Sequence, residues 1–198
     1  MLCFTAEEPN AEVTLSSFGN PPEITSLEYT NFVDFNDKDF IPQMTHYNIN
    51  QTIILENVGD KVYFKVNKLT KAYAKEDNYN TNNDYHTFII NNGKVAASGS
   101  IMSLIDPSCY KLTNTFPCSF ASLFRNQCTD LTEAPELPAT SLATGCYSRM
   151  FVACTSLRKA PDLPAINLSE YCYQYMFSSC AFEKTPKMYA VNLNDFSC

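Results

Sequence analysis

Six cysteines in the C-terminal half of the chain recur at a spacing of 26 residues, and this repeat constrains the fold more than any other feature. One set is Cys128, Cys154 and Cys180, and the other is Cys146, Cys172 and Cys198. Between them, an Ala-Pro-Glu-Leu-Pro-Ala phrase at 134–139 returns as Ala-Pro-Asp-Leu-Pro-Ala at 160–165. A fixed period of this length indicates repeated structural units that cannot bury their apolar faces alone and therefore stack.

The residues of one unit predict its local structure. Leu142, Cys146 and Met150 are spaced four apart, as on one face of a helix. Prolines then exclude a helix from the following segment and leave it extended. We therefore expect a short helix, a turn at the second cysteine and a short extended run. The positions taken as structural, besides the six cysteines, are Leu131, Leu157, Pro135 and Pro161.

The first hundred residues read as β-strands. Short segments alternate apolar and polar residues and are separated by turn-forming residues; they lie at 12–15, 27–29, 52–55, 61–66, 85–90 and 94–97. The turn at 57–60 predicts that residues 51–67 form a hairpin. Several short strands without a helical period indicate a small β-sandwich.

Residues 118–198 resemble the BspA-like leucine-rich repeats of gut bacterial surface proteins. In those repeats the phrase Cys-Tyr-x-x-Met-Phe-x-x-Cys-x-Ser-Leu-x-x-Ala-Pro-x-Leu-Pro-Ala recurs, and residues 146–165 match it at every fixed position. Residues 1–105 resemble the β-rich module that precedes such repeats. The resemblance implies a curved right-handed solenoid used for adhesion and protein recognition. It also extends to arrays carried by phages of those bacteria.

Together these observations predict an α+β fold with two parts. Residues 1–97 form a β-sandwich-like module, and residues 98–198 form a short leucine-rich-repeat-like α/β solenoid. Within the second part we expect a cap at 98–117, where Ile101, Leu104 and Ile105 fill the end of the array, and repeats at 118–198.

Charge and hydropathy exclude several classes of protein. The net charge of −7 and the absence of a basic run argue against nucleic-acid binding. No apolar run reaches the roughly 18 to 20 residues that a membrane span needs. The first residues do not read as a signal peptide. We therefore expect an extracellular, cell-surface location if the chain is part of a longer secreted protein, and a virion location if Met1 is the native start.

The clustered cysteines allow three interpretations. Zinc sites favour closely paired ligands such as Cys-x2-Cys, which the spacings here do not supply. Disulfides would pair Cys146 with Cys154 and Cys172 with Cys180. We favour the third interpretation, in which the thiols are small buried apolar groups that stack on their equivalents in adjacent units. We expect no metal site and no cofactor, and the acidic segment at 34–39 lacks the glycine and terminal glutamate of an EF-hand loop.

Recognition of another molecule is the function that these residues favour. No catalytic residue is predicted; the enzymatic alternative would need His86 to meet a cysteine of the array at the junction of the two parts. Aligned repeat copies differ at surface positions, which are the predicted binding residues Glu133, Arg149, Arg158, Lys159, Tyr175 and Lys184. We expect a non-enzymatic adhesion module on a bacterial surface, with a structural or host-binding component of a phage virion as the alternative. The partner would be a protein or a surface glycan, and multivalent or homo-oligomeric display would offset the small area of the array.

Overall fold

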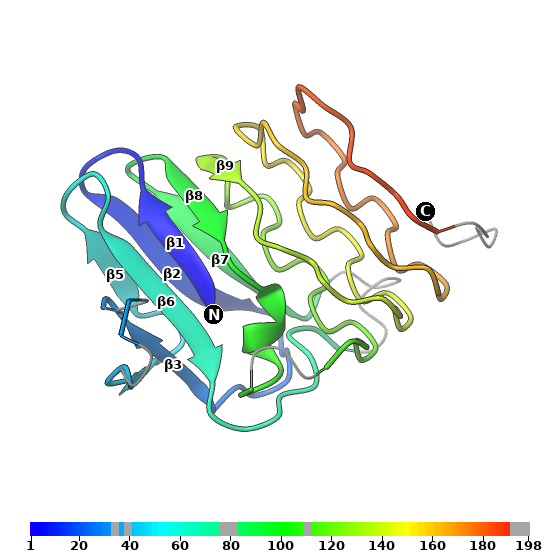
Figure 1. The fold of residues 1–198 in the computed structure, drawn as a ribbon, viewed down its shortest axis with the longest axis horizontal. Helices are drawn as coiled ribbons and strands as arrows, with labels where there is room; N and C mark the ends of the chain where they lie inside the picture. The colour runs from blue at the N-terminus through cyan, green and yellow to red at the C-terminus, as the bar shows by residue number, and fades with distance from the viewer. Residues whose placement is uncertain (33–35, 38–40, 76–82, 109–111, 191–198) are drawn as a thin grey trace.

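The computed structural model describes residues 1–32, 36–37, 41–75, 83–108 and 112–190 (Figure 1). Within those residues it contains nine strands, one short 3-10 helix and no α-helix. The elements are β1 (Leu2–Ala6), β2 (Ala11–Phe18), β3 (Leu27–Thr30), β4 (Thr45–His46), β5 (Thr52–Leu55), β6 (Lys61–Val66), β7 (Tyr85–Asn91), β8 (Val95–Ser98), the 3-10 helix η1 (Ile101–Leu104) and β9 (Leu131–Glu133). The predicted α+β class is therefore wrong, and the described chain is nearly all β.

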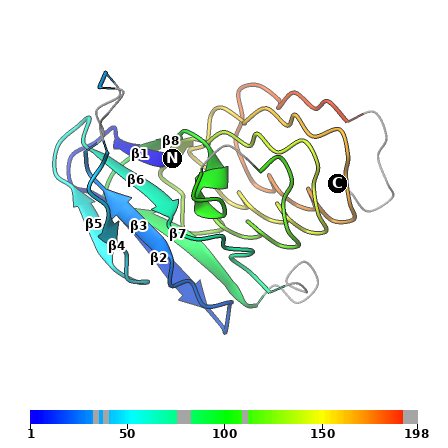
Figure 2. The ribbon, with the colours of Figure 1, turned by 60° about the horizontal axis from the view of Figure 1, so that its bottom comes forward.

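The N-terminal strands form two layers, as expected for a β-sandwich (Figure 2). One sheet has the order β4-β3-β6-β1-β8-β9, and the other has the order β5-β2-β7. Aromatic side chains join the layers: the ring of Phe4 on β1 meets that of Phe88 on β7 at a centroid distance of 4.9 Å, edge to face. Phe64 on β6 meets Phe88 at 5.5 Å. Edge-to-face contacts of this kind bury large apolar area in a preferred geometry.

The predicted hairpin at 51–67 is wrong. β5 pairs with β2 in the small sheet, whereas β6 pairs with β1 and β3 in the large one. The turn between them therefore crosses from one layer to the other. The alternating pattern identified both strands, but it specifies which side chains face the core and not which strand lies alongside.

Each repeat unit opens with a run of tight turns where a helix was expected. These turn segments are residues 117–127, 144–153 and 170–179. Every fourth residue in them has a positive φ, as at Arg149 (55°) and Ala153 (60°) in the second segment and Tyr175 (52°) and Ser179 (62°) in the third. A right-handed α-helix has no such residues. The predicted leucine-rich-repeat α/β solenoid is therefore contradicted, because its units hold no helix.

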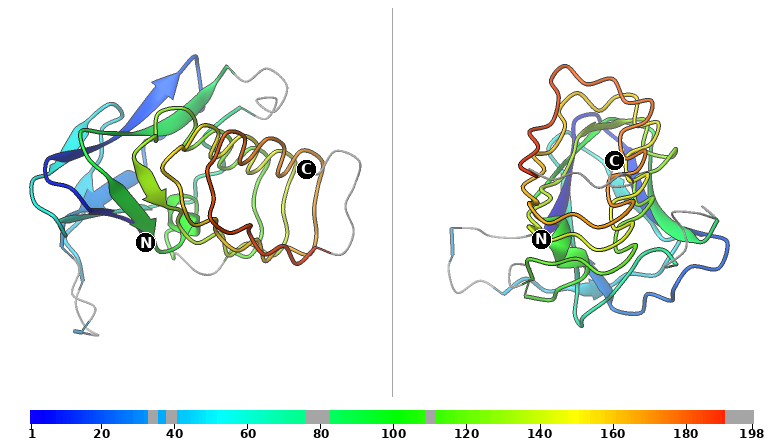
Figure 3. Two further views of the ribbon diagram at one scale, coloured as in Figure 1. Left: turned by 90° about the horizontal axis from the view of Figure 1, so that it is seen from above. Right: turned by 90° about the vertical axis from the view of Figure 1, so that its right-hand side faces the viewer.

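Backbone hydrogen bonds in the turn segments alternate between two kinds of partner. In the second segment the N–H of Met150 bonds three residues back, to Tyr147, and the N–H of Phe151 bonds to the carbonyl of Met176 in the next segment. The neighbouring residues repeat this alternation along the segment. The units thus stack directly on one another, and Figure 3 shows the resulting layers from the side and from the end.

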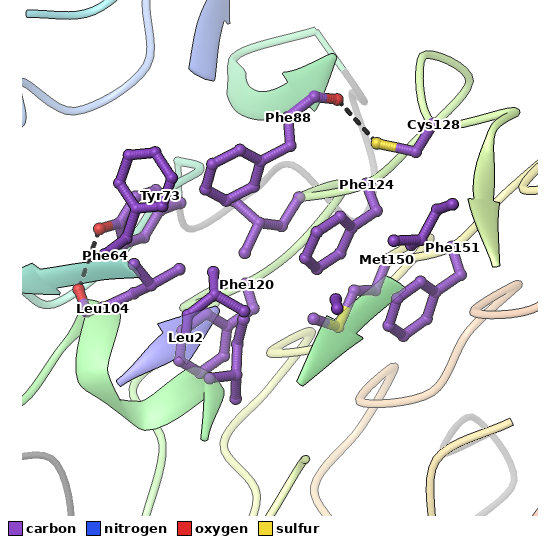
Figure 4. Packing of buried hydrophobic residues seen from close by; sticks show 14 of the residues in the cluster. Leu2, Phe64, Tyr73, Phe88, Leu104, Phe120, Phe124, Cys128, Met150 and Phe151 are labelled. Carbon is purple, nitrogen blue, oxygen red and sulfur yellow. Dashed lines mark hydrogen bonds between the residues drawn. The ribbon is translucent and has the colours of Figure 1, made fainter. Parts of the chain in front are cut away.

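Two columns of stacked rings run through the layers. The first is Phe88, Phe124, Phe151 and Phe177, with successive centroids 5.5, 5.2 and 5.7 Å apart and nearly parallel planes. The second is Tyr73, Phe120, Tyr147 and Tyr173, at 6.5, 5.7 and 6.1 Å. Phe88 and Tyr73 come from the N-terminal part, so each column begins there and continues into the repeats (Figure 4).

The two parts share one hydrophobic core. β9 of the first repeat pairs with β8 in parallel, and the N–H of Phe88 on β7 donates to the carbonyl of Leu123 at 2.7 Å. Both sheets are thereby extended by the repeats. The three residues expected to fill the end of the array, Ile101, Leu104 and Ile105, are fully buried in this core. The boundary between residues 97 and 98 stays a prediction.

Candidate recognition groove

A surface groove of about 300 Å³ lies between the proline-rich runs of the first two repeats. Its walls are the two copies of one phrase, residues 134–138 and 160–162, together with Pro164. The prolines lack the N–H that ladder pairing needs, so the two runs lie side by side without a continuous ladder between them. A parallel bridge between Glu133 and Lys159 fixes their register at one end of the groove. The repeat itself therefore builds the groove.

The groove combines an apolar floor with a charged rim. The leucines Leu137 and Leu163 anchor the two runs in the core, at 3% and 1% exposure. Glu133, Glu136, Lys159 and Asp162 supply exposed charges along the lining. The ammonium of Lys159 and the carboxylate of Glu133 are 4.0 Å apart. Exposed pairs of this kind contribute little to stability, so both side chains can turn toward a partner.

The structure divides the predicted binding residues between two sides of the stack. Glu133 and Lys159 line the groove, and Lys184 stands in register with Lys159 one layer further on. Arg149 and Tyr175 lie together on the turn side, with the guanidinium carbon 5.3 Å from the ring centroid. Such a distance is within the range of a cation–π contact. Arg158 is exposed, and its N–H donates to the carbonyl of Thr132.

Sequence comparison of the copies missed two of the groove's charged residues. Glu136 and Asp162 occupy equivalent positions in the repeated phrase and are both acidic, so a search for positions that differ between copies passed over them. The available signal was the phrase itself. Two prolines in five residues, repeated at 26 residues, predict two adjacent runs that cannot pair fully.

The repeat cysteines stabilise the stack from inside. The thiols of Cys128, Cys154 and Cys180 donate to the carbonyls of Phe88, Phe124 and Phe151, at 3.0, 3.2 and 3.0 Å. Burial raises the pKa of the Cys180 thiol to about 11, and burial also raises the pKa of the Cys128 and Cys154 thiols above the usual value of a cysteine. Thiols held protonated in this way are poor nucleophiles and poor metal ligands.

No disulfide joins the cysteines of the described ranges, so the pairs Cys146–Cys154 and Cys172–Cys180 are not formed. Cys146 and Cys172 are fully buried, as are the structural residues Leu131 and Leu157. Pro135 and Pro161 are also buried, beneath the groove. Cys198, the last residue of the second cysteine set, lies outside the described residues.

Both ring nitrogens of His86 are hydrogen-bonded to residues of the N-terminal part. Its Nε2 is 2.8 Å from the carbonyl of Pro22 and its Nδ1 is 3.0 Å from the hydroxyl of Ser17. A carbonyl only accepts, so Nε2 carries the proton and Nδ1 accepts from the hydroxyl. Burial lowers the pKa of His86. The thiol of Cys128 donates a hydrogen bond to the carbonyl of Phe88. The hydrogen bonds of His86 instead join β2 and β7 to the loop at Pro22.

Among the described residues, no three His, Cys, Asp or Glu side chains are grouped so that they could hold a metal ion. The acidic segment at 34–39 is described only at Asn36 and Asp37. No helix in the described part of the chain has the length and apolar character needed to cross a membrane.

Comparison of the chain with protein-family models, with curated proteins and with solved structures gave no match.

Proposed function

We propose that the chain is a non-enzymatic recognition module that binds another protein through the groove between its first two repeats. The observation that carries this proposal is the groove's composition. An apolar floor supplies area to bury, and four exposed charged side chains on its rim supply specificity. The resemblance of residues 146–165 to the repeats of BspA-like surface proteins supports display on a bacterial surface.

The charges of the groove define what it would bind. Three carboxylates and one ammonium make the rim acidic, so a segment with basic side chains complements it. The groove is small, so one copy offers modest affinity, and several copies on one surface would raise it by effective concentration.

A peptide array and a glycan array, probed with the same labelled protein, test this proposal. We expect binding to basic peptides that the double variant Glu136→Lys with Asp162→Lys loses by at least about tenfold, or 1.4 kcal/mol. The matched control carries the same charge change on the sandwich, as Glu23→Lys with Glu56→Lys, and should keep its binding. Peptide binding that both double variants lose equally, or binding only to glycans, would refute the proposal.

A further inference from the structure

Main-chain hydrogen bonds join each proline-rich run to its outer neighbour, but they do not join the two runs to each other along the groove. On the sandwich side, Glu136 exchanges two bonds with residues 99–101, at 2.9 and 3.1 Å. On the far side, Leu163 exchanges a similar pair of bonds with the third repeat, at 2.8 and 3.3 Å. Between residues 134–139 and 160–165, which are wholly described, no main-chain bond is formed. The groove lies where these bonds are missing.

Leu137 and Asp162 direct main-chain groups toward each other across the groove. In an extended chain the N–H and C=O of one residue point to the same side, and those of the next residue point to the opposite side. Because Glu136 uses both groups toward the sandwich, those of Leu137 face the second run. Because Leu163 uses both groups toward the third repeat, those of Asp162 face the first run. None of these four groups has a hydrogen-bond partner among the described residues.

The junction between the sandwich and the first repeat shows which bonds are missing here. Asp162 follows Glu136 by 26 residues and is its equivalent in the repeat. Paired in the same way, its N–H would donate to the carbonyl of Pro135 and its own carbonyl would accept from Leu137. Neither bond is formed, although Leu137 is only 3% exposed and its main chain has little access to solvent. Buried amides in folded proteins are nearly always paired, so the groove favours a ligand that supplies both donors and acceptors.

A polypeptide main chain matches these open groups. Each of its amides supplies one donor and one acceptor, whereas an ammonium only donates and a carboxylate only accepts. Sugar hydroxyls also donate and accept, but a neutral glycan carries no charge to complement the acidic rim. The carboxylates of Glu136 and Asp162 on that rim favour basic side chains on the ligand. An extended segment with basic side chains supplies the main-chain groups and the charge together.

We propose that an extended segment of the partner protein lies in the groove and pairs its main chain with Leu137 and Asp162. Basic side chains of the segment meet the rim carboxylates, and its amides take the place of the bonds that are missing between the two runs. In this mode of recognition the main-chain bonds give affinity and the side chains give specificity. The inference rests on the function proposed above and adds how the partner is held.

Amide-to-ester replacement in a ligand tests the main-chain bonds, because an ester removes one N–H and keeps the shape of the peptide. The probe is a capped hexapeptide of alternating lysine and valine, with each amide replaced in turn and binding measured by titration calorimetry. Esters at alternate central positions should weaken binding at least about tenfold, and the esters between them should change it by less than about threefold.

The ester series separates this inference from the proposed function. If every ester binds like the parent peptide while Glu136→Lys with Asp162→Lys still abolishes binding, the groove reads charge alone. That result overturns the inference and leaves the proposed function standing. If the hexapeptide does not bind the parent chain, both are contradicted.

Amide hydrogen exchange, followed by NMR on the whole chain, locates the bonds on the protein. Saturating hexapeptide should slow exchange at Leu137 and Asp162 by at least about tenfold. The slowing should persist in the charge-matched control Glu23→Lys with Glu56→Lys. Unchanged exchange at both amides overturns the inference. Slowing that appears without peptide as the protein concentration rises would assign the groove to a second copy of the chain, and it would overturn the inference as well.

Discussion

Residues in the left-handed region set the path of the repeats. Besides Gly145, the turn segments place Arg149, Ala153, Tyr171 and other non-glycine residues at positive φ. Each such residue costs roughly 1–2 kcal/mol relative to the right-handed region. The cost is tolerated because every second N–H is then directed at the next layer, where it finds a carbonyl. An isolated unit would have the strain without those bonds, which explains why the units occur stacked.

Gly99 shows how tightly one such position is constrained. It has a φ of 68°, and an added Cβ would lie 2.1 Å from the carbonyl oxygen of Met1. Gly59 also has a positive φ, 90°, but an added Cβ there meets nothing within 4 Å. We expect Gly59→Ala to lower the free energy of unfolding by about 1 kcal/mol. Gly99→Ala should lower it by at least about 2 kcal/mol more, because the added Cβ clashes with the backbone of Met1. Urea unfolding of both variants measures the difference; equal losses would show that β1 shifts to make room.

His86 makes stability depend on pH. Burial lowers the pKa of His86 in the folded chain below the value of about 6.5 that it has when unfolded. The unfolded chain therefore binds a proton more readily than the folded chain. The stabilising contribution of neutral, buried His86 to the free energy of unfolding is complete above about pH 6.5, and it is lost as the pH falls from there toward the lower folded pKa. Urea unfolding at pH 7.5 and at pH 5 should show that the free energy of unfolding falls more between these pH values in the parent chain than in His86→Gln. The exposed His46 provides the control, since His46→Gln should keep the parent's loss. An unchanged pH dependence in His86→Gln would contradict this assignment.

At the scale of elements, the turn segments explain why the helix prediction failed. Leu142, Cys146 and Met150 are spaced four apart, and that spacing suits one helical face and a run of four-residue turns equally well. The φ angles distinguish a helix from a run of turns. Positions with positive φ are occupied here by residues such as Arg149 and Tyr175, and these residue types do not indicate a positive φ in a sequence. The alternation that located β2 and β6 has no such competitor, so those strands could be predicted. β1 was missed because it is buried on both faces and does not alternate.

The ring columns predict that removing a buried ring in the middle of a column costs more stability than removing the last described ring. Phe151 is fully buried, between Phe124 at 5.2 Å and Phe177 at 5.7 Å. Phe151→Ala should therefore lower the free energy of unfolding by about 3–5 kcal/mol. Phe177 is only partly buried and has no described ring stacked on its outer side, so Phe177→Ala should cost distinctly less. Guanidinium unfolding curves compare the two variants, and an equal or larger loss for Phe177→Ala would show that the column is not the main source of the stability of the stack.

At the scale of the whole molecule, the N-terminal part acts as the first layers of the stack. β8 is extended by β9 and then by bridges at Lys159 and Lys184, while β7 is extended by the three turn segments. A sequence shows two different patterns on either side of residue 98 and so suggests two units. It does not show that both sheets continue across the change of pattern, because that continuity depends on strand neighbours that are distant in sequence.

One shared core implies that the chain unfolds as one cooperative unit. An array of independent repeats would instead lose its terminal layers first. We expect amides in β1 and β6 to exchange faster in Phe151→Ala than in the parent chain. The decrease in the free energy of opening at these amides should equal the decrease in the free energy of global unfolding that the variant shows. The substitution lies in the second repeat, two layers beyond β7, so the effect can reach β6 only through the common core around Phe88 and Phe124. Native-state hydrogen exchange under conditions of rapid reclosing makes the comparison. Unchanged exchange in β6, with faster exchange confined to residues 144–179, would show that the repeats unfold separately from the sandwich.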